Sequence, residues 1–162
     1  MPFPNVGETA PDFDSLDDNG AALKLSEHRG ERIVLYFYPK ADTPGCTKQA
    51  CSIRDNYQLF RKQAVTVIGV SPDTVEDQAA FKAKYDLPFT LVADADHSVS
   101  ELYGLWGDHK ITFNGVEHTT NGTRRSTFVI EPDGTISYAQ FGVSATDNPG
   151  EILDFLEGKT PA

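Results

Sequence analysis

Cys46 and Cys51 are the only cysteines in the 162-residue chain, and they stand five residues apart. A thiolate attacks electrophiles and disulfides, so such a pair can carry out nucleophilic or redox chemistry. The pair can also be two small buried side chains or a permanent staple. A metal site has less support, because the spacing Cys-x4-Cys lacks a second cysteine pair and the four histidines are scattered.

The segments on either side of Cys46 predict a buried strand followed by a helix. Residues 33–38 are apolar or aromatic without polar alternation, which is typical of a strand buried on both faces. After Cys46, apolar residues recur every three or four positions, so we expect an amphipathic helix that runs to about Lys62. Pro39 and Pro44 end the strand and shape the turn. The thiol of Cys46 is therefore expected in the first turn of a helix.

This position favours a reactive thiolate at Cys46. The first turn of a helix presents unpaired N–H groups and a partial positive charge, and both favour the thiolate. On the helical wheel Cys46 lies in the apolar stripe, whereas Cys51 is rotated by roughly 140° toward the polar side. Five residues also rise about 7.5 Å, and bonded cysteines need Cα atoms closer than about 7 Å. A Cys46–Cys51 disulfide therefore requires the first turns of the helix to unwind.

The stretch from Tyr38 to Cys51 has the pattern Tyr-Pro-x-x-x-Thr-Pro-Gly-Cys-Thr-x-x-x-Cys, which resembles the active-site motif of peroxiredoxins. The similarity is to the bacterioferritin-comigratory (Q-type) subgroup, of the atypical two-cysteine kind. Further matches include YGLWG at residues 103–107 and RSTFVI at residues 125–130. The resemblance therefore covers nearly the whole chain, from about Gly7 to Leu156.

The resemblance implies a thiol-dependent peroxidase and gives roles to five residues. Cys46 would attack the peroxide and become a sulfenic acid, and Cys51 of the same chain would resolve it as an intramolecular disulfide. Arg125, which matches the arginine of the family's Arg-x-Thr/Ser-Phe motif, would favour the thiolate and donate to the peroxide. The Thr43 hydroxyl would bond a peroxide oxygen, although a turn threonine commonly bonds its own backbone. Pro39 would shield the thiolate from water, or only end the strand.

The resemblance also implies partners for an antioxidant enzyme. The substrates would be hydrogen peroxide and organic hydroperoxides, and thioredoxin or a similar thiol donor would reduce the redox-active disulfide. No metal, haem or flavin cofactor is implied. A monomer suffices for this chemistry, because both cysteines belong to one chain.

Two other classes of function compete with the peroxidase. A thiol–disulfide exchanger would suit the same fold, but such enzymes generally carry Cys-x-x-Cys, and Thr43 and Arg125 would have no role. A non-catalytic acidic interaction domain would leave residues 39–51 unexplained.

Composition and charge narrow the class of protein, its binding partners and its compartment. At 39% hydrophobic and 23% charged residues, the chain is globular and has the length of one domain. A net charge of −10 argues against nucleic acid and anionic membrane surfaces, which attract basic proteins. No apolar run approaches the roughly 20 residues of a membrane span, and the first residues do not resemble a signal peptide. We therefore expect a cytoplasmic protein, where a cysteine pair is more often catalytic than structural.

We expect residues 1–162 to form a single α/β domain with a thioredoxin-like fold: a mixed central sheet, helices on both faces and an N-terminal hairpin. Asn19-Gly20 predicts that hairpin. Strands at residues 33–38, 65–70 and 90–92 alternate with helices, as in a parallel sheet. The helix between the second and third of these strands is expected to open at residues 71–73. Strands at 126–130 and 135–141 predict an antiparallel pair, and Asp147 or Asn148 should cap the last helix. Residues 104–124 predict a loop or an irregular hairpin.

Overall fold

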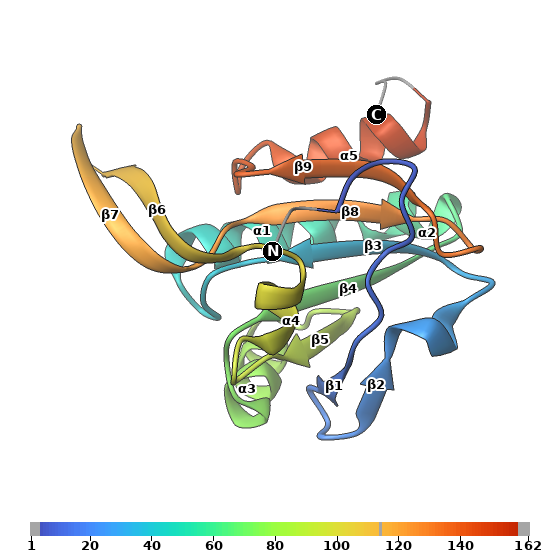
Figure 1. Ribbon diagram of the computed structural model, residues 1–162, viewed down its shortest axis with the longest axis horizontal. Helices are drawn as coiled ribbons and strands as arrows, with labels where there is room; N and C mark the ends of the chain where they lie inside the picture. The colour runs from blue at the N-terminus through green and yellow to red at the C-terminus, as the bar shows by residue number, and fades with distance from the viewer. Residues whose placement is uncertain (1–3, 114, 159–162) are drawn as a thin grey trace.

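The computed structural model describes residues 4–113 and 115–158. A seven-stranded mixed sheet with the order β2-β1-β5-β4-β3-β8-β9 forms its centre (Figure 1). The strands of this sheet are β1 (Asp14–Asp17), β2 (Ala22–Lys24), β3 (Arg32–Phe37), β4 (Val65–Ser71), β5 (Thr90–Ala93), β8 (Ser126–Ile130) and β9 (Ile136–Phe141). Strands β3, β4 and β5 run parallel, and the remaining neighbours pair antiparallel.

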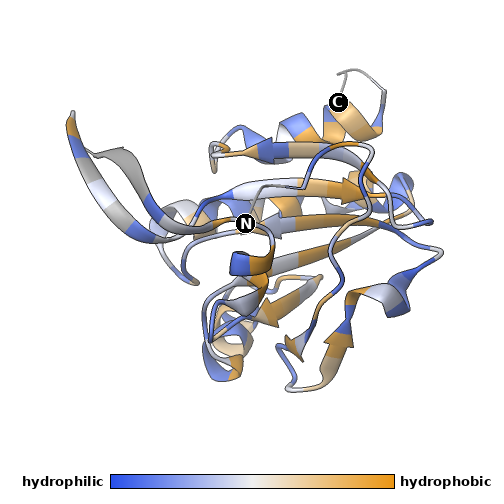
Figure 2. Ribbon diagram, viewed as in Figure 1, coloured by the Kyte–Doolittle hydropathy of each residue, from blue (hydrophilic) through white to orange (hydrophobic). Residues whose placement is uncertain are grey.

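Strand β3 is buried on both faces, which explains its continuous apolar sequence. Val34 and Tyr36 belong to one hydrophobic core, while Leu35 and Phe37 belong to the core on the other face. Successive side chains of a strand point to opposite faces, so a central strand between two helical layers needs apolar residues at every position. Hydrophobic residues accordingly concentrate in the central strands (Figure 2).

Helices cover both faces of the sheet, as the sequence predicts for a thioredoxin-like domain. One core contains residues of α1 (Pro44–Asp55), α2 (Tyr57–Lys62), α3 (Val75–Tyr85) and α5 (Asn148–Leu156). The other contains residues of α4 (Ser98–Leu102), the 3-10 helix η1 (Leu25–His28) and the N-terminal segment. None of the helices in the described ranges is long and apolar enough to cross a membrane. The expected fold class is confirmed, with the predicted N-terminal hairpin formed by β1 and β2.

The single helix expected up to Lys62 is wrong, because the chain breaks it in two at Asn56. Helix α1 ends at Asp55, and the Asn56 side chain donates to the backbone carbonyl of Ser52 at 2.8 Å. An asparagine that bonds the preceding turn in this way ends a helix by competing for its carbonyls. Both cysteines lie in α1, so the break does not alter their expected separation and relative orientation on one helix.

Two other helix starts also differ from expectation. Helix α3 begins at Val75, where the Thr74 hydroxyl accepts from the backbone N–H of Asp77 at 3.1 Å, so residues 71–73 precede the helix. In α5 neither Asp147 nor Asn148 provides a side-chain cap. The Asn148 side chain is turned instead into the protein, where it accepts a hydrogen bond from Gln49.

Residues 106–113 and 116–123 form two regularly paired strands rather than a loop or an irregular hairpin. Strands β6 (Trp106–Phe113) and β7 (Val116–Thr123) pair antiparallel from Trp106 with Thr123 to Phe113 with Val116. This hairpin forms its own two-stranded sheet and projects from the body of the protein (Figure 1). The Arg124 N–H donates to the carbonyl of Leu105 at 2.8 Å and closes its base.

Candidate active site

Cys46 is the third residue of α1 and its side chain is buried, with 1% of its surface exposed. The chain leaves β3, passes through residues 38–42 and enters the helix at Thr43, whose extended backbone precedes Pro44. The Thr43 carbonyl accepts the first helical bond, from Thr47 N–H, at 2.8 Å. The sulfur of Cys46 therefore lies in the first turn, where backbone N–H groups are unpaired.

Arg125 brings a fixed positive charge to this sulfur. Its Nη2 donates to Cys46 Sγ at 3.4 Å, across 79 residues of sequence. Arg125 directly precedes β8, the antiparallel neighbour of β3, so the sheet places it beside the end of the strand that leads to Cys46. Gly45 permits the approach, because a β-carbon there would lie 3.2 Å from Arg125 Nη2. The guanidinium therefore places an N–H donor and a fixed positive charge beside the sulfur.

A buried hydrogen-bond network fixes the direction of the Arg125 guanidinium. Gln49 Oε1 accepts from Arg125 Nη1 at 2.6 Å, and Gln49 Nε2 donates to Asn148 Oδ1 at 2.9 Å. Asn148 Oδ1 also accepts from the Thr127 hydroxyl at 3.0 Å. Gln49, Asn148 and Thr127 are all fully buried. The network therefore ties the guanidinium to α1, α5 and β8 at once.

The sequence prediction missed these three polar residues. Gln49 gave a signal, because it stands three residues after Cys46 and so lies on the same, buried face of α1. A polar residue in an apolar stripe needs a partner, and Arg125 is that partner. Asn148 and Thr127 gave no signal in the sequence. The contacts of Asn148 with Gln49 and with Thr127 depend on the tertiary fold.

Thr43 and Pro39 both precede Cys46 in the chain, at three and seven residues from it. The Thr43 hydroxyl donates to the Lys40 carbonyl at 2.9 Å, which is the backbone interaction expected of a turn threonine. A hydroxyl that donates keeps its lone pairs, so Thr43 Oγ1 is still able to accept from the O–H of a peroxide. Pro39 is exposed just beyond β3, and its shielding of Cys46 stays a prediction.

Cys51 occupies the same intact helix as Cys46, and both are free thiols. It is half-buried, whereas Cys46 is buried, as the helical wheel predicts. Arg54, one turn further on, donates from Nη1 to the carbonyl of Tyr85 at 2.7 Å and attaches this end of α1 to α3. The two sulfurs are thus held on different sides of one helix.

Two tyrosines of the β3 region lie in the same core as Cys46. Burial raises the pKa of Tyr36 and of Tyr38 well above its ordinary value of 10.0. The Tyr38 hydroxyl donates to Gln78 Oε1 at 2.7 Å. Both phenols are therefore neutral at physiological pH, and their rings pack beneath the catalytic helix.

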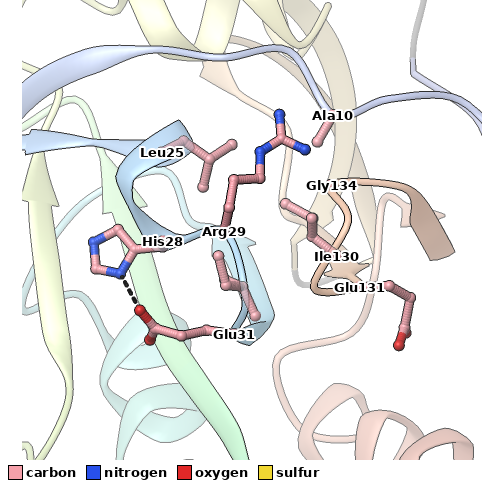
Figure 3. A pocket seen from close by; sticks show the side chains of 9 residues that line it. Ala10, Leu25, His28, Arg29, Glu31, Ile130, Glu131 and Gly134 are labelled. Carbon is pink, nitrogen blue, oxygen red and sulfur yellow. Dashed lines mark hydrogen bonds and ion pairs between the residues drawn. The ribbon is translucent and has the colours of Figure 1, made fainter.

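A small hollow at the opposite end of β3 does not compete as an active site (Figure 3). It is lined by Leu25, Arg29 and Ile33, among others, and its volume is about 10 Å³. Such a volume holds no more than a single water molecule. In the described part of the chain, no group of three or more His, Cys, Asp or Glu residues is placed to hold a metal ion.

A cysteine in the first turn of a helix, with an arginine bonded to its sulfur at the edge of a thioredoxin-like sheet, defines the class of thiol-dependent peroxidases. Comparison with known proteins identifies the family within that class. Residues 6–139 match the model of the AhpC/TSA family, and the chain belongs to it, in the bacterioferritin-comigratory (Q-type) subgroup of the peroxiredoxins.

Relatives and solved structures agree with this assignment along almost the full chain. Peroxiredoxin Bcp of Bacillus subtilis is 40% identical over 153 residues, which are 94% of each chain. A PrxQ mutant structure from Xylella fastidiosa has a TM-score of 0.85 at 28% identity and covers 98% of each chain. The Xanthomonas campestris bacterioferritin comigratory protein, studied for its alkyl peroxide reduction activity, has a TM-score of 0.80 at 28% identity over 90% of each chain.

Proposed function

We propose that this peroxiredoxin reduces hydrogen peroxide and organic hydroperoxides with Cys46 as the attacking cysteine and Cys51 as the resolving one. The observation that carries the proposal is the 3.4 Å hydrogen bond from Arg125 Nη2 to Cys46 Sγ. The chain has no third cysteine, and in the described part of the chain only the sulfur of Cys46 accepts a hydrogen bond from an arginine. The alkyl peroxide activity of the Xanthomonas campestris relative supports organic substrates.

In the first step the Cys46 thiolate attacks one peroxide oxygen and the O–O bond breaks. The sulfur is oxidised to a sulfenic acid, and the other oxygen leaves as hydroxide or alkoxide, which takes up a proton to become water or an alcohol. Arg125 donates an N–H toward the leaving oxygen, where negative charge develops. Thr43 Oγ1 accepts from the peroxide O–H and aligns the bond for in-line attack.

In the second step the sulfur of Cys51 attacks the sulfenic sulfur of Cys46. An S–S bond forms, the S–O bond breaks and water leaves. The two cysteines are on one intact helix, so the first turns of α1 have to unwind before the sulfurs meet.

Regeneration needs an external dithiol, for which a thioredoxin-like donor is the proposed source. Its two thiols exchange with the Cys46–Cys51 disulfide, so that the donor is oxidised as the enzyme is reduced. Because both cysteines belong to one chain, we propose a monomer, acting in the reducing environment of the cytoplasm.

The test is the thiol count and intact mass of the reduced protein before and after one equivalent of hydrogen peroxide. Wild type is expected to lose both thiols quickly and the mass of two hydrogens, within one chain. Cys51→Ser is expected to gain one oxygen and stop there, and Cys46→Ser to react no faster than an ordinary thiol. Full turnover of Cys46→Ser with thioredoxin would overturn the assignment, and a product linking two chains would overturn the monomeric mechanism.

A further inference from the structure

The loop between β3 and α1 is attached to neighbouring elements just before the catalytic helix begins. Asp73, which follows β4 and is 8% exposed, accepts from the backbone N–H of Ala41 at 2.7 Å and from the Ser71 hydroxyl at 2.6 Å. This buried contact fixes the loop to the end of β4. Asp42, which follows Ala41 in the loop, makes different and more exposed contacts.

Asp42 is bonded to the last turn of α3 by two side chains. Its Oδ2 accepts from Lys84 Nζ at 2.9 Å, and its Oδ1 accepts from the Tyr85 hydroxyl at 2.8 Å. The backbone of Asp42 has a φ of 57°, in the left-handed region that most L residues avoid. The carboxylate contacts therefore hold a backbone conformation that costs free energy by itself. We call these two hydrogen bonds the Asp42 latch.

The latch acts on the end of α1 that has to move. Asp42 immediately precedes Thr43 and the turn that contains Cys46, whereas the other end of α1 is held by Arg54 on the Tyr85 carbonyl. Tyr85 thus contacts both ends of the helix, by its hydroxyl and by its carbonyl. A movement of the first turns that draws Asp42 with it would break the hydroxyl contact and leave the carbonyl contact in place.

After Tyr38, the exposed part of the loop faces α3 across a hollow. This hollow has a volume of about 220 Å³ and is lined by residues of the loop and of α3 that include Lys40 and Ala80. The latch spans this region, whereas the buried start of the loop is joined to α3 by Tyr38, which bonds Gln78 and packs against Phe81. Exposed ion pairs like that of the latch are weak, which suits a contact that opens in every catalytic cycle.

We propose that Asp42 is a positioning residue whose latch holds the start of α1 helical. The latch thereby sets the equilibrium between the helical conformation that reduces peroxide and the unwound conformation that forms the disulfide. The proposal rests on the proposed function, since it assigns a role within the two-cysteine cycle. With the latch closed, Thr43, Cys46 and Arg125 keep the geometry that receives peroxide. With it open, the turn is released and Cys46 is free to reach Cys51.

The test compares two latch variants with a matched control. Asp42→Asn removes the charge paired with Lys84 while keeping a residue that tolerates the left-handed backbone, and Tyr85→Phe removes the other bond. Asp86→Asn is the control, because Asp86 is an exposed aspartate with a similar φ of 51° at the end of α3 and outside the latch. Rapid-quench mass spectrometry of a single turnover separates sulfenic acid formation, which depends on peroxide concentration, from disulfide formation, which does not.

We expect both latch variants to form the disulfide about two- to fivefold faster than wild type, with sulfenic acid formation unchanged or slower. Asp86→Asn should match wild type in both steps. Added salt should accelerate the disulfide step of wild type but not of Asp42→Asn, because it screens the Lys84 pair. A merely structural role would slow both steps together.

Disulfide formation at or below the wild-type rate in both latch variants would overturn the latch and leave the proposed function intact. Equal acceleration by Asp86→Asn would overturn it as well. A wild-type protein that forms no sulfenic acid with peroxide would instead refute the proposed function, and the latch with it.

Discussion

Replacing Gln49 by leucine tests whether the active-site arginine depends on its buried partner. Leucine has a similar volume, so packing around α1 is largely kept, but the acceptor for Arg125 and the donor to Asn148 are lost. A hydrogen bond to a charged group contributes about 1.5–3 kcal/mol and a neutral one about 0.5–1.5 kcal/mol. Asn148 Oδ1 keeps its bond from Thr127, which limits the loss. We expect Gln49→Leu to lower the free energy of unfolding by about 2–4 kcal/mol, measured by urea denaturation.

The Gln49→Leu enzyme that remains folded should also react more slowly with peroxide. Without Gln49, the guanidinium of Arg125 loses the contact that directs Nη2 toward Cys46 Sγ. Complete loss of a donor to developing negative charge costs about 10²–10³-fold in rate. Misdirecting the donor should cost at least about tenfold in the second-order rate constant with hydrogen peroxide, measured by stopped-flow competition.

Thr127→Val is the matched control for this prediction. It removes only the bond to Asn148 and leaves the Arg125–Gln49 contact in place, so stability should fall by about 1 kcal/mol with a much smaller change in rate. If folded Gln49→Leu reacts with peroxide within twofold of wild type, the reasoning is refuted, and Arg125 is oriented without the network.

Three further predictions concern backbone geometry and pH. Gly69→Ala should destabilise the fold by about 1–3 kcal/mol in chemical denaturation, because its β-carbon would lie 2.9 Å from the buried Tyr36 ring; an unchanged midpoint would show that the ring can shift. Gly134→Ala should lower the melting temperature, since φ is +91° there and the new methyl group would overlap the Arg29 guanidinium beside the hollow in Figure 3. A melting temperature equal to that of wild type would contradict this. Hydrogen bonds from its lysine and tyrosine partners lower the pKa of the Asp42 carboxyl below 3.8, so its contribution to stability is present above that pH and is lost as pH falls through the lower, folded-state value. The melting-temperature difference between wild type and Asp42→Asn should therefore be constant near neutral pH and vanish in acid, and a constant difference down to pH 2 would count against the ion pair.

The sequence predicted the architecture well, because burial leaves a pattern that can be recognised. Residues 33–38 have apolar side chains on both faces, and only a central strand requires that. The Asn19-Gly20 turn likewise predicted the first hairpin. The break at Asn56 was missed, because whether an asparagine bonds the preceding turn or faces solvent is decided by its surroundings.

The site was predictable only where the motif is local or familiar. Cys46 in a first helical turn follows from its neighbours in sequence, whereas Arg125, 79 residues away, was identified by family resemblance. Asn148 has no local feature that distinguishes an inward network residue from a helix cap, and the fold alone decides between them. The same holds for Asp42 and Asp73, whose partners come from α3, β4 and the loop itself.

Within the described residues, the hairpin of β6 and β7 pairs with no strand of the main sheet, next to which Cys46 and Arg125 lie. Its two strands pair with each other, and the Arg124–Leu105 bond closes its base one residue before Arg125. Residue pairs can therefore be added to or removed from the far end while the arginine keeps its place at the edge of the main sheet. For evolution this makes the ribbon a tolerant site for variation, and for protein engineering it offers a place to insert a tag or a reporter peptide at some distance from the reacting sulfur.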